Sequence, residues 1–273
     1  MKVDLHIHTT FSDGRFTPAE VVKKSHVIGL KAIAITDHDT VEGIPQAMEE
    51  ARKYNDIEVI PGLEINTYYN GQEVHILGYF IEYNKPDLKK ILTDLLQKRI
   101  ERAKKMTEKL KQLGIDISFE EIKARATGPS LGRPHVARVL MDKGYAKCIE
   151  DAFEKFLNPG RPAYVPRHKL TPFNAVDIIK QSKGIPVLAH PGLLYEKHII
   201  HELIDYGIMG IEVYHKDHTI EQVKYYMNFA SDRGLLMTGG SDSHGETPLL
   251  LGTLDIPWEF VLKLKQEKSR CCM

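Results

Sequence analysis

Short apolar runs of strand length recur along the chain, each rich in Ile, Val and Leu and bounded by Gly, Pro or Asp. The runs span residues 2–8, 31–39, 57–65, 73–81, 185–191, 208–215, 235–244 and 249–257. Helical patterns separate several of them. Between the first two runs, Thr17 and Glu20 have the spacing of a capping box and Gly29 follows the last helical position, and residues 171–184 repeat this arrangement. Strands that alternate with helices predict a parallel α/β sheet, either open or closed into a barrel.

The alternation breaks after residue 83, where apolar positions keep a helical period from residue 86 to residue 114. Further helical patterns follow at residues 118–126, 133–144 and 150–157. We therefore expect an α/β body formed by residues 1–85 and 171–273, with residues 86–170 inserted as an all-α cap over one end.

The chain carries 37 basic and 37 acidic residues, so no overall charge attracts nucleic acid or an anionic membrane. Basic side chains do gather on the helix expected from residue 86, but Glu101 and Glu108 interrupt them, and we interpret this series as a solvated face rather than a nucleic-acid stripe. The series is Lys98, Arg99, Arg102, Lys104, Lys105 and Lys109. The chain shows no signal core, no run of membrane-spanning length and no disulfide framework among its three cysteines. We expect a soluble, cytoplasmic protein.

Histidine and carboxylate side chains lie in or just after the strand-like runs. The candidates are His6, His8, Asp13, His38, Glu64, His75, His190, Asp242 and His244. In α/β barrels the carboxyl ends of the strands meet at one mouth, so side chains from separate runs would converge there. Six imidazoles and three carboxylates buried together require a cation to compensate them, and this set of ligands is typical of borderline divalent ions.

The number of candidates exceeds the three protein ligands of a mononuclear catalytic zinc site, and three ions with one bridging carboxylate fit the set better. Three divalent cations against three carboxylates leave a surplus of about +3. A dianionic phosphate monoester would complement that surplus, whereas a neutral amide or glycoside would not.

The chain resembles the PHP (polymerase and histidinol phosphatase) family of metal-dependent phosphoesterases through "DLHIHTTFSDG", "AITDHDTVEG", "PGLEIN", "VHILGYF", "LAHPG" and "GGSDSHG". The resemblance implies a distorted (β/α)7 TIM-like barrel with three divalent metal ions of Mn, Fe or Zn. It places His6, His8, Glu64 and Asp242 on one ion, Glu64, His75 and His190 on a second, and Asp13, His38 and His244 on a third. A hydroxide bridging two ions, at the position held by Glu64, His75 and His190, would be the nucleophile. The insertion with "GRPHVARVL" is similar to the stand-alone branch of the family that acts on nucleotides and short RNA.

Three further carboxylates, Asp4, Asp37 and Asp39, could orient ligand imidazoles, although a cap or turn role explains Asp39 equally well. For His215, a role in the site and an ordinary position in a strand both remain open. Four other histidines are interpreted as surface residues: His26, His168, His198 and His201.

Arg133 and His135 in "GRPHVARVL" are the best candidates for binding phosphate outside the metals, and the resemblance implies the same pair. The alternative for Arg133 is a structural salt bridge. Lys216 and His218 follow the sixth run and could also reach the substrate. Tyr164 could stack on a base.

The function that this set predicts is hydrolysis of a terminal phosphate ester, on a nucleotide or at the 5′ end of a short RNA. A capped pocket suits small or end-on substrates and excludes extended duplex nucleic acid. Three alternatives remain: a histidinol phosphate phosphatase, which the insertion disfavours; a non-catalytic, metal-stabilised accessory module; and a metal-dependent amide hydrolase, which typically uses a lysine bridge where this chain has Glu64. The oligomeric state is left open.

Overall fold

The computed structural model describes residues 2–126, 128–166 and 170–271. Its centre is a seven-stranded sheet whose strands follow one another in chain order. The strands are β1 (Lys2–Ile7), β2 (Leu30–Ile35), β3 (Glu58–Tyr69), β4 (Gln72–Tyr79), β5 (Ile185–Leu188), β6 (Gly210–His215) and β7 (Leu236–Gly240). The N–H of His8 donates to the carbonyl of Ser243 at 3.0 Å, so the two edges of the sheet meet beyond β1 and β7. The sheet is thus a nearly closed barrel, and the predicted distorted α/β barrel is confirmed.

The strand direction departs from the expected parallel order at β4, which runs antiparallel to both β3 and β5. Asn70 and Gly71 join β3 to β4 with φ angles of 45° and 89°. These left-handed conformations are what a two-residue Asn-Gly hairpin requires. A hairpin rather than a helix therefore connects the two strands, and the prediction of a wholly parallel sheet is wrong here.

The last apolar run, residues 249–257, forms a turn and an irregular segment rather than a strand. Its Leu251 and Ile256 are buried in the clusters that also contain Ile7 and Leu5 of β1. The apolar character of this run reflects burial against the barrel, so the prediction of a strand there is wrong.

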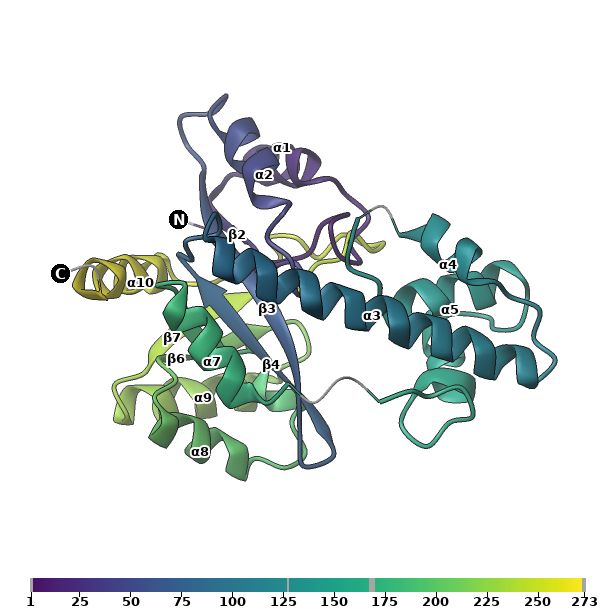
Figure 1. Ribbon diagram of the computed structural model, residues 1–273. Coiled ribbons are helices and arrows are strands. Elements are labelled where there is room, and N and C mark those ends of the chain that lie inside the picture. The colour runs from purple at the N-terminus through teal and green to yellow at the C-terminus, as the bar shows by residue number, and fades with distance from the viewer. Residues whose placement is uncertain (1, 127, 167–169, 272–273) are drawn as a thin grey trace.

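Helices cover the outside of the barrel (Figure 1). They are α1 (Pro18–Ile28), α2 (Ile44–Ala51), α7 (Pro172–Gln181), α8 (His198–Tyr206), α9 (Ile220–Asp232) and α10 (Trp258–Cys271), with a short 3₁₀ turn at Pro191–Leu193. The capping box predicted at Thr17 and Glu20 is present, and Gly29 follows α1 with φ of 86°. Within the described residues, no helix combines the length and the apolar character needed to cross a membrane.

The segment between β4 and β5 forms the predicted helical insertion. Its helices are α3 (Pro86–Gln112), α4 (Phe119–Arg125), α5 (Arg133–Asp142) and α6 (Ile149–Ala152), the last continuing as a π-helical turn at Phe153–Leu157. Buried side chains from residues 103–163 form a core of their own, whereas Leu88, Leu92 and Leu95 of α3 pack in the barrel core. Figure 1 shows α3 running from the barrel to the lobe of α4 and α5. The division at residue 86 stays a prediction, because α3 packs in both cores.

A hydrogen bond from Tyr79 crosses the interior of the barrel. Tyr79 on β4 is fully buried, and its hydroxyl donates to the carbonyl of Leu5 on β1 at 2.9 Å. Because β2 and β3 lie between these strands in the sheet, the bond joins separate walls of the barrel.

We expect Tyr79→Phe to lower the free energy of unfolding by about 1–2 kcal/mol, because a buried hydrogen bond is lost. Urea denaturation followed by circular dichroism measures this change. Tyr225→Phe is the matched control, because Tyr225 is 57% exposed, and it should change the unfolding free energy by less than about 0.5 kcal/mol. Equal effects of the two substitutions would contradict a stabilising role for the bond.

Candidate metal centre

One end of the barrel gathers the predicted ligand residues into three groups, within each of which the ligand-capable atoms lie within 4.8 Å of one another. The groups are His8, Asp13, His38 and His244; His6, His8 and Glu64; and Glu64, His75 and His190. Asp242 lies beside the second group, with Oδ1 3.0 Å from His8 Nε2 and 3.5 Å from His6 Nε2. The structure therefore brings all the predicted ligand residues together, and Glu64 is shared by two groups. A ligand role for each stays a prediction.

The strands explain this convergence. His6 and His8 are two residues apart at the end of β1 and project to one side, with ring centroids 5.2 Å apart. Glu64 on β3 and His75 on β4 are diagonal neighbours across the hairpin, and His75 Nδ1 lies 2.8 Å from Glu64 Oε1. The hairpin that departs from the parallel order thus builds part of the centre.

Three of the residues around the centre have positive φ angles without being glycine. The angles are 54° at Asp39, 28° at His190 and 49° at Asp242. This region of backbone space is unfavourable for most L-residues, and such conformations concentrate at functional sites. Each one lies just beyond the end of a strand and turns a side chain toward the centre or its supports.

The buried polar atoms of the centre fit a set of divalent cations. Among the described residues, His6 Nε2, His8 Nε2, Asp13 Oδ1 and Glu64 Oε2 are buried with no hydrogen-bond partner of acceptable geometry. Leaving such an atom unsatisfied costs about 1–3 kcal/mol, and more when it is charged. Imidazole nitrogens and carboxylate oxygens are the donors that Zn, Mn and Fe accept, so the residues present suit these ions.

The shifted pKa values favour ionised carboxylates and a neutral His38 at the centre, whereas His8 holds a proton. Burial opposes ionisation of Asp13, but the imidazoles of His244 and His38 hold its pKa well below the ordinary value. Neighbouring imidazoles likewise outweigh burial and lower the pKa of Glu64. Burial lowers the pKa of His38 to about 4, so its ring is neutral. Neighbouring carboxylates overcome burial and raise the pKa of His8 to about 10, so a cation bound there would displace a proton.

Glu212 lies at the centre, and the sequence analysis did not single it out. It is fully buried on β6, its Oε1 lies 3.0 Å from His6 Nδ1, and its Oε2 accepts the N–H of His190 at 2.8 Å. It thus fixes the orientation of one predicted ligand and the backbone of another. The available signal was a lone carboxylate in the middle of the apolar run 208–215.

Asp37 acts on His8 through a neighbour. It accepts hydrogen bonds from the N–H and hydroxyl of Thr9 at 2.7 and 2.6 Å and from the hydroxyl of Ser12 at 2.5 Å. The Ser12 hydroxyl also lies 3.5 Å from His8 Nδ1. Asp37 therefore holds the loop around this imidazole rather than the ring itself.

Asp4 differs from its predicted role. Its carboxylate accepts the backbone N–H groups of His6, Ser241 and Gly252, at 3.4, 2.9 and 2.9 Å. A partner for an imidazole was predicted, but these bonds go to backbone and tie β1 to the segment after β7. The predicted role is therefore wrong, and Asp4 holds the two edges of the barrel together instead.

Arg133 and Lys216 lie at the edge of the centre and are held by carboxylates. Arg133 Nη2 is 2.9 Å from both oxygens of Glu73, so the salt bridge foreseen as an alternative is present. Lys216 Nζ donates to the carbonyl and to Oδ2 of Asp242, at 2.9 and 3.0 Å. His135 is buried at the start of α5, where its Nδ1 accepts the N–H of Gly132 at 3.1 Å.

His218 does not point its ring nitrogens toward the centre. Its Nδ1 lies 2.8 Å from the carbonyl of Val213, and its Nε2 accepts the N–H of Gly192 at 3.0 Å. Both nitrogens are occupied by backbone, so the expected contact with substrate is not supported. His215, left open before, is buried with Nε2 3.5 Å from Asp242 Oδ2, and it belongs to the surroundings of the centre.

The other assignments have mixed outcomes. His198 and His201 are exposed and His26 is partly exposed, as expected for surface residues, whereas His168 lies outside the described residues. Tyr164 is partly buried. The solvated-face interpretation is wrong for Arg99 and Arg102, which are only 9% and 8% exposed.

Comparison with known proteins agrees with this geometry. A family model for the PHP domain matches residues 4–158. The 5′-3′ exoribonuclease Rnm of Salmonella typhimurium is 34% identical over 251 residues, covering 90% of this chain and 86% of the relative. The 3′,5′-nucleoside bisphosphate phosphatase of Chromobacterium violaceum is 33% identical over 249 residues, covering 89% and 87%. A solved structure from Bifidobacterium adolescentis, assigned as a metal-dependent phosphoesterase, matches with a TM-score of 0.88 and 28% identity over 96% of this chain and 94% of that one.

The barrel, its cluster of donors and these similarities define the class of the protein, which is a metal-dependent hydrolase of phosphate esters. The chain belongs to the PHP family. The resemblance inferred from the sequence motifs is thereby confirmed.

We expect Glu212→Gln to weaken binding of divalent metal by about 10- to 100-fold, because the imidazole of His6 loses an ionised partner. Calorimetric titration of metal-free protein with Mn²⁺ or Zn²⁺ measures the affinity. Glu221→Gln, at an exposed position of α9, is the control and should bind as the wild type does. Wild-type affinity in Glu212→Gln would show that this carboxylate does not support the centre.

Proposed function

We propose that the protein removes terminal phosphate from nucleotides, either nucleoside monophosphates or 3′,5′-bisphosphates, or releases single nucleotides from the 5′ ends of short RNA, with three divalent ions of Mn, Fe or Zn in its centre. The observation that carries the proposal is the sharing of Glu64 by two ligand groups, with a third group beside them. The two relatives, an exoribonuclease and a nucleoside bisphosphate phosphatase, support a nucleotide substrate.

When bound, the ions would polarise phosphoryl oxygens and lower the pKa of a coordinated water. The chain supplies the charge balance. Asp13, Glu64 and Asp242 contribute fewer negative charges than three divalent ions contribute positive ones, so the loaded centre complements a dianion such as a phosphate monoester. Glu64 Oε1 lies 2.8 Å from His75 Nδ1 and 3.2 Å from His190 Nε2, and this contact holds the two rings against the shared carboxylate.

Two cations at the edge of the centre support binding of phosphate. The salt bridge to Glu73 holds Arg133 near the centre, because Glu73 Oε2 lies 3.8 Å from His75 Nε2. Lys216 is held against Asp242. Arginine offers a planar pair of donors that matches phosphate oxygens, and lysine adds a point charge. We assign both, together with the buried His135, to the binding of substrate phosphate.

The insertion lies against the loop that carries Asp13. Arg138 of α5 donates to the carbonyl of Asp13 at 2.7 Å, and the N–H of Ser130 donates to the carbonyl of Phe11 at 3.4 Å. A cap in this place favours small substrates or chain ends and excludes an extended duplex. This arrangement supports a role of the insertion in substrate binding.

A panel of phosphate esters tests the proposed function. We expect metal-loaded protein to release phosphate from 3′,5′-bisphosphates or nucleoside monophosphates, or single nucleotides from 5′-phosphorylated oligoribonucleotides, and histidinol phosphate to react far more slowly. Removal of metal with a chelator should abolish turnover, and added Mn²⁺ or Zn²⁺ should restore it. Turnover that survives complete metal removal, or a preference for histidinol phosphate, would contradict the proposal.

We expect His8→Ala and Asp242→Ala each to lower kcat/KM by more than about 100-fold, because each removes a predicted metal ligand. Circular dichroism should show the barrel intact. His201→Ala, at an exposed position of α8, is the control and should keep wild-type rates. Near-native rates in either variant would show that the ligand assignment is wrong.

A further inference from the structure

Arg99 on α3 is a buried cation that the proposed function does not use. Its side chain is 9% exposed, and its Nε donates to Asp39 Oδ2 at 2.6 Å. Asp39 is itself buried. Removing one partner of a buried ion pair costs several kcal/mol of stability, because the other charge is left buried without compensation. The pair therefore forms only while α3 stays docked on the loop that follows β2.

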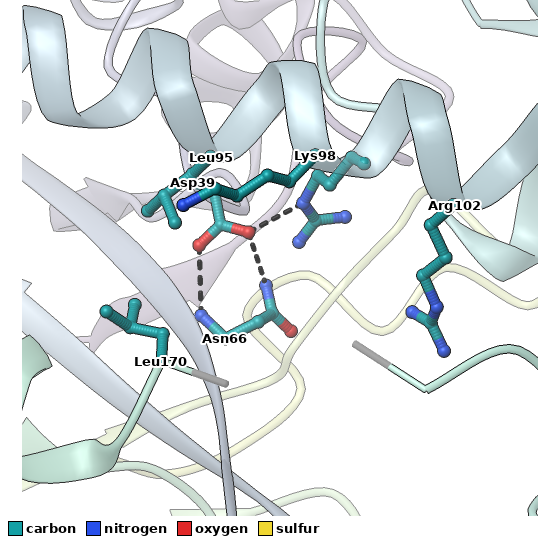
Figure 2. A pocket seen from close by; sticks show the side chains of 7 residues that line it. Asp39, Asn66, Leu95, Lys98, Arg102 and Leu170 are labelled. Atoms are coloured by element: carbon teal, nitrogen blue, oxygen red, sulfur yellow. Dashed lines mark hydrogen bonds and ion pairs between the residues drawn. The ribbon is translucent and has the colours of Figure 1, made fainter. Parts of the chain in front are cut away.

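The carboxylate of Asp39 contacts a residue that lies against His38 of the metal centre. It accepts the backbone N–H of Asn66 at 3.0 Å and lies 3.5 Å from the side-chain nitrogen of Asn66. That side-chain nitrogen lies 2.9 Å from His38 Nδ1. The N–H of Asp39 also donates to the carbonyl of Glu64 at 3.0 Å. Figure 2 shows Asp39 and Asn66 joined in this way beneath α3.

A second nitrogen of the Arg99 guanidinium contacts the insertion. Arg99 Nη1 donates to the carbonyl of Leu131 at 3.2 Å. Leu131 and Gly132 immediately precede α5, whose first turn carries Arg133 and His135. The N–H of Gly132 in turn donates to His135 Nδ1. One side chain thus contacts both the supports of His38 and the segment to which we assign phosphate binding.

We propose that Arg99 is a positioning residue that couples the metal centre to the phosphate-binding segment of the insertion. The phosphate-binding role of that segment rests on the proposed function. The planar guanidinium donates in two fixed directions, one to Asp39 and one to Leu131. A lysine ammonium keeps the charge but cannot reproduce this fork. The two contacts can therefore be separated by substitution.

Arg99→Met removes both contacts, and Arg99→Lys keeps only the ion pair with Asp39. In Arg99→Met we expect the affinity of metal-free protein for Mn²⁺ or Zn²⁺, measured by calorimetry, to fall by about tenfold or more. In Arg99→Lys the affinity should stay within about twofold, while KM for a 5′-phosphorylated dinucleotide rises roughly tenfold at nearly unchanged kcat. The visible spectrum of the Co²⁺-loaded protein should change in Arg99→Met only.

Arg102→Lys is the matched control, because Arg102 lies one turn further along α3 and is equally buried. It donates from Nε to the carbonyl of Val165 at 2.7 Å, and Figure 2 shows it apart from Asp39 and Asn66. Neither metal affinity nor KM should change with this substitution.

Wild-type metal affinity in Arg99→Met, or an equal loss of affinity in Arg99→Lys and Arg102→Lys, would overturn the proposal. If Arg99→Met does not fold, Arg99→Lys decides, since unchanged KM in that variant contradicts the coupling. The metal titration needs no substrate. Absence of turnover in the wild type would therefore refute the proposed function and leave the effect of Arg99 on metal binding to be judged by itself.

Discussion

The structure depends on burial of many unsatisfied ligand atoms at one end of the barrel. His6, His8, Asp13 and Glu64 place buried ligand-capable atoms there that lack a hydrogen bond of acceptable geometry. Burial of such atoms is costly unless protons or cations compensate them, and divalent cations suit this set of donors. The positive φ angles at Asp39, His190 and Asp242 add backbone strain at the same end. Cations bound at this end of the barrel would therefore both stabilise the region and supply its chemistry.

The supports of the centre come from distant parts of the chain. Glu212 on β6 holds His6 on β1, and Asp39 and Asn66 hold His38. Arg99 extends this network into the insertion, so a segment that looks peripheral in sequence contacts groups that hold a predicted ligand residue. Barrel and insertion are thus joined by hydrogen bonds even though each has a core of its own.

Local patterns predicted an α/β sheet, open or closed, and the positions of the candidate ligand residues after its strands, and the motif resemblance added the closed barrel. Strand-length apolar runs, the capping box of α1 and the polar residues after each run are visible without knowledge of contacts. The β3–β4 hairpin was also visible in Asn70–Gly71, a strong turn signal that the expectation of alternating helices obscured. The run 249–257 could not be told from a strand, because burial against a barrel selects the same apolar residues as membership of its sheet.

The supporting residues were harder to predict because their partners are remote. Glu212 looked like part of a strand, and its role depends on a histidine at the other end of the chain. Arg99 stood in a basic series with the composition of a solvated face, and only the position of Asp39 beneath α3 shows that it is buried. Pairings of this kind depend on tertiary contacts that no periodicity in one sequence contains.

The most direct test of the account is the metal content of protein purified without chelator, measured by inductively coupled plasma mass spectrometry. The account predicts close to three equivalents of Mn, Fe or Zn per chain. Protein that is folded and carries one equivalent or none, even after incubation with these ions, would contradict the central claim.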